Sequence, residues 1–133
     1  MSQEDVELLQ EVLEALDEGG VDAVLPFIHP DFEFSTPPSI SVEPETYRGH
    51  DGLRRYFDQW YDAADLVRVV PEEFFDAGDR VVVDFRLMAR GKETGIESEL
   101  RAGMVWHMRN GQAVGLEIFP TLADAKETAG LAT

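Results

Sequence analysis

The hydrophobic pattern changes its period near the middle of the chain, and this change constrains the fold more than any other feature. Before residue 65, apolar residues recur at steps of three and four, which is typical of amphipathic helices. After that point, apolar and polar residues alternate over several segments separated by turn-forming residues, which predicts strands of an antiparallel meander. Helices followed by a sheet predict an α+β fold.

The predicted elements divide the chain into a helical half and a sheet half. In the first half we expect helices at 3–18, 21–28 and 49–65, a short strand at 31–36 and a loop at 37–45. In the second half we expect strands at 66–76, 80–91, 97–109 and 112–119, followed by a helical turn at 122–131. No linker or repeat interrupts this order, so we predict a single domain over residues 1–133.

The charge of the chain is strongly negative. It carries 27 acidic and 11 basic residues, which gives a formal net charge of −16. A surface this acidic repels phosphate backbones and anionic lipids, so we expect neither nucleic acid nor a membrane as a partner. No apolar run approaches the roughly 18–20 residues of a membrane span. The lack of cysteine and the acidic, amphipathic N-terminus, unlike a signal peptide, fit the cytoplasmic location that we predict.

The sequence contains no pattern that is typical of a metal or cofactor site. His29, His50 and His107 are the only histidines, and they lack the short spacings of metal ligands. Phosphate-binding loops, dinucleotide fingerprints and serine nucleophile elbows are absent as well. We therefore predict neither a bound metal nor a cofactor.

Five segments that together span nearly the whole chain occur in a family-specific order: "GGVDAVLPFIHPDFEF", "YRGHDGLRRYFDQW", "DAGDRVVVDFR", "VWHMRNGQ" and "LADAKETAGL". In these segments the chain resembles the SnoaL-like domains of the nuclear-transport-factor-2-like superfamily, which are related to ketosteroid isomerases and polyketide cyclases. The resemblance implies a cone, in which a curved antiparallel or mixed sheet packs on three N-terminal helices around an apolar pocket. It also implies a homodimer. It does not imply one activity, because the superfamily contains several kinds of enzyme and proteins without catalysis.

The best-understood chemistry of these relatives, that of the ketosteroid isomerases, is not expected here. By the resemblance, the base and the two tyrosines of that enzyme fall on Thr36, Val12 and Phe57. A threonine hydroxyl has no accessible basic form at neutral pH. The strand "LRAGMVWHM", where the oxyanion aspartate should lie, has no carboxylate. Whether the chain is an enzyme of another kind is left open.

The hairpin "MVWHMRNGQAVGLEIF" decides whether the pocket holds an acid. Alternation places Met104 and Trp106 on one face of the first strand and His107 on the other. In the second strand it places Leu116 on one face and Glu117 on the other. Which of these faces coincide depends on the loop, because a slip of one residue exchanges the two faces of a strand.

Two loop lengths are open at the sequence "RNG". A two-residue loop would pair Met104 with Glu117 and place the carboxylate in the pocket. A three-residue loop would pair Met104 with Leu116 and Trp106 with Val114. We expect the three-residue loop, because it matches apolar faces and avoids burying a carboxylate, which costs several kcal/mol unless it is paired or protonated.

With the three-residue loop, the polar residues of the hairpin leave the pocket. Val105, His107 and Glu117 are then expected on the outer face of the sheet, where the resemblance places the homodimer contact. Glu117 should lie opposite Gly103 and close to Arg101, as part of an interface ion pair.

We therefore predict a SnoaL-like protein whose apolar pocket binds a small hydrophobic or aromatic molecule. The expected ligand contacts are Phe34, Thr36, Phe57, Trp60, Phe85, Met104, Trp106 and Leu116. The alternative is an enzyme of the polyketide-cyclase, isomerase or hydrolase kind that uses a pocket acid. Its candidate acids and bases are Glu117, Asp84 and His29, although alternation should turn Asp84 outward with Arg86. A dimerisation module is a third alternative.

Overall fold

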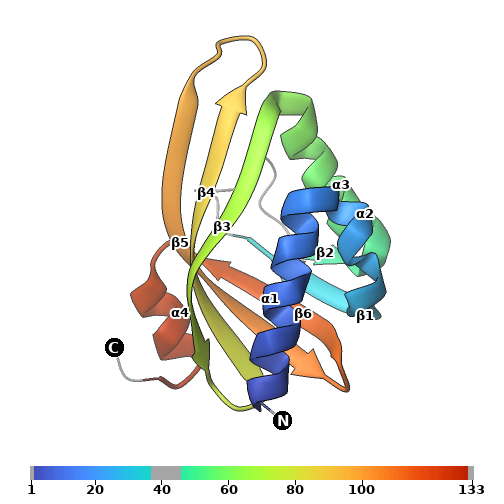
Figure 1. Cartoon of the computed structure of the whole chain (residues 1–133), viewed down its shortest axis with the longest axis vertical. Coiled ribbons are helices and arrows are strands. Elements are labelled where there is room, and N and C mark those ends of the chain that lie inside the picture. The colour runs from blue at the N-terminus through green and yellow to red at the C-terminus, as the bar shows by residue number, and fades with distance from the viewer. Residues whose placement is uncertain (1, 37–45, 132–133) are drawn as a thin grey trace.

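The α+β arrangement expected from the sequence is confirmed in the computed structural model (Figure 1). The structure describes residues 2–36 and 46–131, so the loop expected at 37–45 lies outside the described residues. The helices are α1 (Ser2–Gly19), α2 (Val21–Val24), α3 (Gly49–Ala63) and α4 (Leu122–Thr128), with a 3₁₀ turn at Leu25–Phe27. The strands are β1 (Ile28–Ser35), β2 (Thr46–Arg48), β3 (Ala64–Asp76), β4 (Arg80–Gly91), β5 (Glu97–Arg109) and β6 (Gln112–Phe119).

The strands form one curled sheet in the order β2-β1-β6-β5-β4-β3. The four strands of the second half form the expected antiparallel meander. The sheet is mixed because β1 pairs in parallel with β6, while β2 pairs antiparallel with β1. Strand β1 begins earlier than expected, at Ile28, and includes Pro30; its register against β6 shifts between Ile28 and Glu33, where a proline is tolerated.

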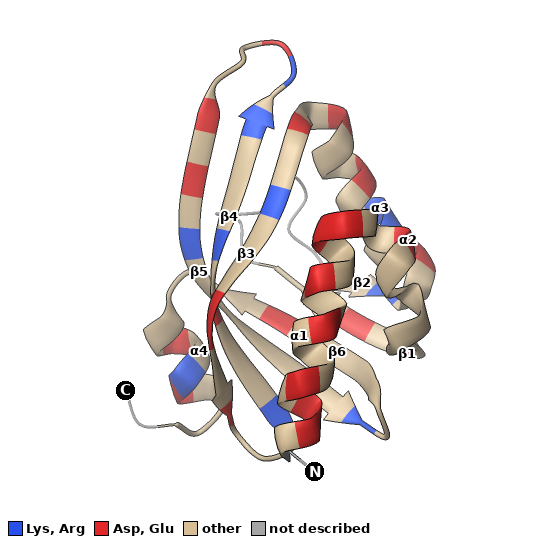
Figure 2. Cartoon of the chain, viewed as in Figure 1, with Lys and Arg blue, Asp and Glu red and all other residues tan. Residues whose placement is uncertain are grey.

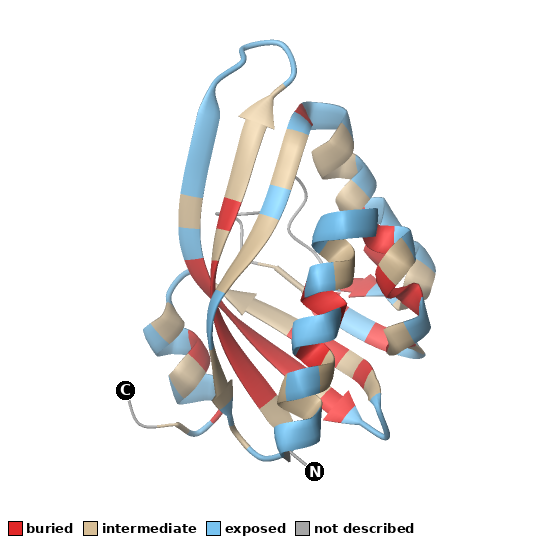
Figure 3. Ribbon diagram, viewed as in Figure 1, coloured by how far each residue is buried: buried red, intermediate tan, exposed pale blue. Residues whose placement is uncertain are grey.

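Helices α1, α2 and α3 pack on the inner face of this sheet, and α4 packs on its outer face (Figure 1). The main core lies between the first three helices and the sheet, where the strand residues are buried (Figure 3). From α1 it receives Leu9, Val12 and Leu13, which recur at helical spacing. Phe32 and Phe34 extend from β1 into the same core.

The acidic residues of α1 lie on its solvent side (Figure 2). Glu4, Glu7, Glu11 and Glu14 are all exposed, opposite the buried apolar stripe of the helix. The acidic composition is therefore accommodated at the surface, and the charge of α1 does not enter the core behind it.

A second, smaller core lies on the outer face under α4. It contains Val82, Val105, Ala125 and Ala129. Helix α4 can approach the sheet closely because Gly103 has no side chain beneath it: a Cβ atom there would lie 2.7 Å from the Cβ of Ala125. Val105 is consequently 0% exposed, because α4 of the same chain covers it, and its expected contact with a second copy stays a prediction. The homodimer itself remains a prediction.

The loop of the β5–β6 hairpin is two residues long, so the expected three-residue loop is wrong. Arg109 pairs with Gln112, and the residues between them, Asn110 and Gly111, have φ angles of 50° and 79°. Positive φ at both central residues is the mark of a type I′ turn, whose twist matches that of the two strands it joins. Asn-Gly is the residue pair that this turn prefers.

The side chains beyond the turn nevertheless lie on the expected faces, because a β-bulge follows it. The register of the hairpin shifts between His107 and Met108, with Val114 as the additional residue of β6. One additional residue exchanges the faces of every residue after it. Trp106 therefore lies opposite Leu116, and both belong to the inner core.

The individual pairs differ from those expected by two residues. Met104 lies opposite Ile118, and Glu117 lies opposite Val105 rather than opposite Gly103. A shift of two residues keeps each side chain on its face and changes only its neighbour across the ladder.

Candidate functional site

An apolar cavity lies between helices α1–α3 and the inner face of the sheet, with a volume of about 50 Å³. Seven of the eight residues expected to contact a ligand line it: Phe34, Phe57, Trp60, Phe85, Met104, Trp106 and Leu116. Val12, one of the positions that the resemblance assigns to a catalytic tyrosine, lines it too. The role of these residues in ligand contact remains a prediction.

Of the eight expected ligand contacts, only Thr36 is not among the described residues that line the cavity. It follows the last residue of β1, and its Oγ1 is buried without a hydrogen-bond partner in the described part of the chain. Its position beyond the strand end explains the difference, because strand alternation no longer determines where a side chain points.

Helix α3 contributes a stripe of four side chains to the cavity: Leu53, Tyr56, Phe57 and Trp60. Sequence reasoning identified Phe57 and Trp60 as ligand contacts and missed Leu53 and Tyr56, of which Tyr56 is 4% exposed. The signal was present, since Tyr56 follows Leu53 by three residues and precedes Trp60 by four. Among the described lining residues, Tyr56 alone carries a hydroxyl group.

Tyr56 is held among other aromatic rings. Its ring centroid lies 4.7 Å from that of Phe34 and 5.3 Å from that of Tyr47, both in edge-on arrangements. Burial raises the pKa of the Tyr56 phenol to about 12; a hydrogen bond with the Trp60 side chain opposes this rise, and the electrostatic interaction with Tyr47 adds to it. At neutral pH this hydroxyl is protonated, so it can donate a hydrogen bond but cannot act as a base.

The raised pKa of Tyr56 makes stability fall in alkaline solution. Below pH 10 both folded and unfolded states keep the proton; between pH 10 and about 12 the unfolded state loses it first. Unfolding should therefore become easier by about 2–3 kcal/mol over this interval. Urea unfolding from pH 9 to 12 measures it, with Tyr56→Phe as the control. If both proteins lose stability equally over this interval, Tyr56 is not the cause.

The two indole groups of the cavity differ in their hydrogen bonding. Trp106 donates from Nε1 to the Sδ atom of Met104 at 3.1 Å. The Nε1 atom of Trp60 is buried and makes no hydrogen bond of ordinary geometry in the described part of the chain, but its interaction with the Tyr56 hydroxyl lowers the pKa of that group. The two tryptophans thus interact with different side chains of the cavity, Trp106 with Met104 and Trp60 with Tyr56.

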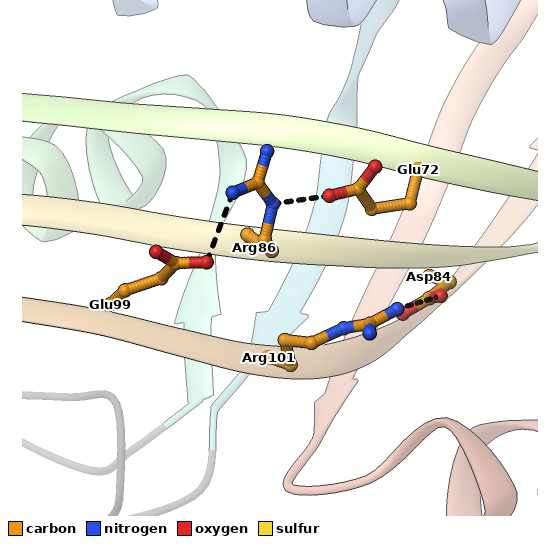
Figure 4. A network of polar contacts seen from close by, with 5 residues as sticks. All are labelled: Glu72, Asp84, Arg86, Glu99 and Arg101. Carbon is orange, nitrogen blue, oxygen red and sulfur yellow. Dashed lines mark hydrogen bonds and ion pairs between the residues drawn. The ribbon is translucent and has the colours of Figure 1, made fainter.

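Glu117 and Asp84, the two acidic candidates, are not among the described residues that line the cavity. Both lie on the outer face of the sheet. Glu117 Oε1 lies 2.9 Å from His107 Nε2, so the expected ion pair between Glu117 and Arg101 is wrong. Arg101 instead donates from Nη2 to Oδ2 of Asp84 at 2.7 Å (Figure 4). The residue opposite Glu117 is Val105, which moves the carboxylate away from Arg101 along the strand.

Asp84 faces outward together with Arg86, as expected, and its ion-pair partner is Arg101. Its side chain is 11% exposed, and the guanidinium of Arg101 compensates its charge. Arg86 instead bridges Glu72 and Glu99 from the neighbouring strands (Figure 4). The two arginines thus belong to separate ion pairs on one face of the sheet.

The third candidate, His29, lies at the start of β1 and also outside the cavity lining. Its Nδ1 atom accepts a hydrogen bond from the backbone N–H of Asp31 at 3.0 Å. This bond ties the imidazole to its own strand. Whether His29, Asp84 or Glu117 takes part in catalysis is untested.

A shallow groove of about 450 Å³ crosses the outer face beside the hairpin. His107 and Glu117 line it, together with Glu33 and Asp79. Val114 lines it as well, so its expected place inside the pocket is wrong; as the bulge residue it leaves the inner face. The groove is polar and open, unlike the cavity inside.

Two further observations concern the described residues only. They contain no group of three or more His, Asp or Glu side chains that could hold a metal ion. No helix among them combines the length and apolar character needed to cross a membrane.

A mixed six-stranded sheet with three helices on one face and one helix on the other defines an α+β protein of the nuclear-transport-factor-2-like (NTF2-like) fold. A sequence model of the SnoaL-like domain matches residues 9–116, so the chain belongs to the SnoaL-like family. The resemblance inferred from the sequence is thereby confirmed. No curated protein matches the chain.

Solved structures share the fold at low sequence identity. An NTF2-like protein of unknown function from Burkholderia pseudomallei is 25% identical, with a TM-score of 0.76 over 92% of this chain and 94% of that one. TerC, co-crystallised with polyporic acid, is 24% identical, with a TM-score of 0.77 over 94% and 97% of the two chains. A candidate SnoaL-like polyketide cyclase from Jannaschia sp. CCS1 is 16% identical, with a TM-score of 0.74 over 89% and 85%.

Proposed function

We propose that this SnoaL-like protein binds a small hydrophobic or aromatic molecule in the cavity between its first three helices and the sheet. The lining carries the proposal: its described residues are apolar or aromatic, and none is Asp, Glu, Lys, Arg or His. Pockets for small molecules are mostly apolar with few polar groups. Burial of an apolar ligand there is favourable by roughly 25 cal/mol per Å² of apolar surface removed from water.

The cavity must enlarge to accept such a molecule. Its volume of about 50 Å³ is far below the roughly 300–1,000 Å³ of typical ligand pockets. Six lining residues are only half-buried, and five of them come from α1, α3 and β3: Leu16, Phe57, Trp60, Val67 and Val69, with Ile118 of β6 as the sixth. We infer that a ligand enters between α1, α3 and β3, because the half-buried side chains there are less enclosed than the buried ones of the remaining lining.

The lining gives no support to the alternative of an enzyme with a pocket acid. General acid–base catalysis needs a titratable group within hydrogen-bond reach of the substrate. Glu117 and Asp84 lie on the outer face, and His29 bonds to its own strand. Binding without acid–base catalysis therefore accounts best for the described cavity.

Two matched substitutions in α1 test the binding proposal. Leu16 and Leu8 are both half-buried leucines packed on the core, but only Leu16 lines the cavity. We expect naphthalene to raise the melting temperature of the wild-type protein. Leu16→Phe should weaken its affinity at least about tenfold by narrowing the entrance, an effect of about 1.4 kcal/mol. Leu8→Phe should leave the affinity unchanged.

Isothermal titration calorimetry with naphthalene measures these affinities, and thermal-shift assays check them. A wild-type protein that shows no binding up to the solubility limit would contradict the proposal. Equal losses of affinity in the two variants would show that the ligand site is not this cavity.

A further inference from the structure

We propose that Asn110 is a site of spontaneous chemical modification in the folded protein: its side-chain amide is lost as ammonia, and part of the product is an isoaspartyl residue that disrupts the β5–β6 turn. Asn110 is not among the described residues that line the apolar cavity. The inference is therefore independent of the function proposed above.

The sequence supplies the two residues that this reaction needs. Asn110 is the only asparagine of the chain, and Gly111 follows it. The backbone nitrogen of Gly111 can attack Cγ of Asn110 and close a succinimide ring. The bond between Cγ and the amide nitrogen then breaks, and this nitrogen leaves as ammonia with the proton of the Gly111 N–H. Glycine favours the attack, because it has no Cβ atom to crowd its nitrogen.

Water then opens the succinimide at either of its carbonyl carbons. Opening at Cγ gives aspartate. Opening at the backbone carbonyl carbon of residue 110 gives isoaspartate, in which the main chain runs through Cβ and Cγ. Both products carry a carboxylate in place of the neutral amide. The solvent supplies the water, so the reaction requires no oxidant, cofactor or partner protein.

The structure leaves the reacting groups open to solvent. Asn110 and Gly111 are both exposed at the tip of the hairpin (Figure 1). The hydrogen bond that closes such a turn joins the flanking residues, here Arg109 and Gln112. The N–H of Gly111 donates to no carbonyl among the turn and loop bonds of the described residues. A Cβ atom on Gly111 would meet no atom within 4 Å, so no other described segment packs on this side of the turn.

A second residue pair shows what the fold adds to the sequence. Asp51 also precedes a glycine, and it can form the same ring with loss of water instead of ammonia. This pair, however, lies near the start of α3, and Gly52 is buried. A Cβ atom on Gly52 would lie 3.0 Å from the backbone carbonyl carbon of Tyr47, so the chain has no room to rearrange there. The fold therefore favours the reaction at Asn110 and opposes it at Asp51.

The isoaspartyl product is the one that the turn cannot accommodate. Asn110 and Gly111 have φ angles of 50° and 79°, as a type I′ turn requires. Aspartate, like asparagine, is enriched among residues with positive φ, so it should preserve the turn. Isoaspartate adds a methylene group to the main chain between Arg109 and Gln112, and the pairing of these two residues leaves no place for it.

The modification should also affect the groove on the outer face. Arg109 and Val114 line this groove together with His107 and Glu117. A longer turn displaces the strands next to the β-bulge, so it should weaken the contact of 2.9 Å between His107 Nε2 and Glu117 Oε1. We expect the isoaspartyl form to differ from the native protein in this region and the aspartyl form to match it.

The test follows oxygen from the solvent into the protein. The full-length protein is incubated at mildly alkaline pH in water enriched in a heavy oxygen isotope, once in its native state and once unfolded in guanidinium chloride. Each ring opening adds a labelled oxygen to the residue concerned. Digestion in ordinary water and peptide mass spectrometry then give the rates at Asn110 and Asp51, without counting reactions that occur during digestion.

We expect Asn110 to react in the native protein at a rate within about tenfold of that in the unfolded chain, a difference in activation free energy of about 1.4 kcal/mol. A reaction that required global unfolding would be slower by the equilibrium constant of unfolding, roughly 10³-fold or more. Asp51 should react in the unfolded chain and be protected in the native protein. If folding protects Asn110 as strongly as Asp51, the inference is wrong.

The effect on the hairpin is tested with the separated products. Chromatography isolates the isoaspartyl form, and Asn110→Asp is the matched control, because it carries the same charge without the added methylene group. In proton–nitrogen NMR spectra, the amide signals of β5 and β6 next to the turn should shift further in the isoaspartyl form than in Asn110→Asp. If both give the same spectrum, the turn tolerates isoaspartate and the proposed disruption is wrong.

Discussion

Replacing Phe34 with alanine is expected to lower the free energy of unfolding by about 3–5 kcal/mol, the usual cost of truncating a buried phenylalanine. Phe34 is 2% exposed and lies opposite Tyr47 of β2 and Leu116 of β6. Its ring also packs edge-on against Tyr56 of α3, at 4.7 Å between centroids. One side chain therefore joins three strands and a helix, and the space that it leaves cannot be refilled by a single neighbour.

The adjacent residue provides the control for this prediction. Glu33 lies on the opposite face of β1 and pairs with Arg48, where both side chains are more than half exposed. Such pairs contribute little, so Glu33→Ala should change stability by less than about 1 kcal/mol. Urea unfolding measures both variants. If Phe34→Ala does not fold, Phe34→Leu should still lose about 1–2 kcal/mol. A loss below about 1 kcal/mol in both Phe34 variants would mean that Phe34 is not a central core residue.

Gly103→Val is expected to cost about 3 kcal/mol and to loosen α4 from the outer face. A Cβ atom at this position would lie 2.7 Å from the Cβ of Ala125 and 3.0 Å from both the Cα of Leu122 and the carbonyl oxygen of Thr121. Two of these three atoms belong to the backbone, so the helix must move as a whole. Overpacking usually costs about 1–3 kcal/mol, and a clash with backbone reaches the upper part of this range.

Lys126 in α4 makes the movement of the helix measurable. If α4 detaches, trypsin should cleave after Lys126 faster in Gly103→Val than in the wild-type protein, because proteolysis reports local opening. Ser98→Val, at an exposed position of the same strand, should change neither the cleavage rate nor the stability by more than about 0.5 kcal/mol. Unchanged cleavage in Gly103→Val would show that α4 is not held by its contact with Gly103.

The strands of the second half could be predicted closely from the sequence. Strands β4, β5 and β6 have the expected bounds, and β3 begins two residues early. Their ends are marked by turn residues, and their interiors alternate strictly, so the local signal was strong. Strand β2 was missed because three residues are too few to show a period, although Tyr47 at its centre is 0% exposed.

The candidate site was predictable in part for the same reason. Seven of the expected ligand contacts line the cavity because the period of a helix or strand determined which face they occupy. Thr36 lies beyond its strand, where the period ends.

The sequence by itself determined how the residues of each strand divide between two faces. Trp106 separates from His107, and Leu116 from Glu117, because successive side chains point in opposite directions along any strand. Only the tertiary structure decided which faces of β5 and β6 coincide. The turn alone would have placed Glu117 inside, and the bulge at Val114 returned it to the outer face.

The outer face shows the same division between local and long-range effects. Alternation placed Val105 on it, but only the packing of α4 on Gly103 buried Val105 within its own chain. The direction of a side chain is a property of the local backbone. The register of a strand, and the packing of a helix over the sheet, depend on contacts between distant segments. For that reason the sequence predicted an apolar interior, and only the structure located the candidate acids Glu117 and Asp84 outside it.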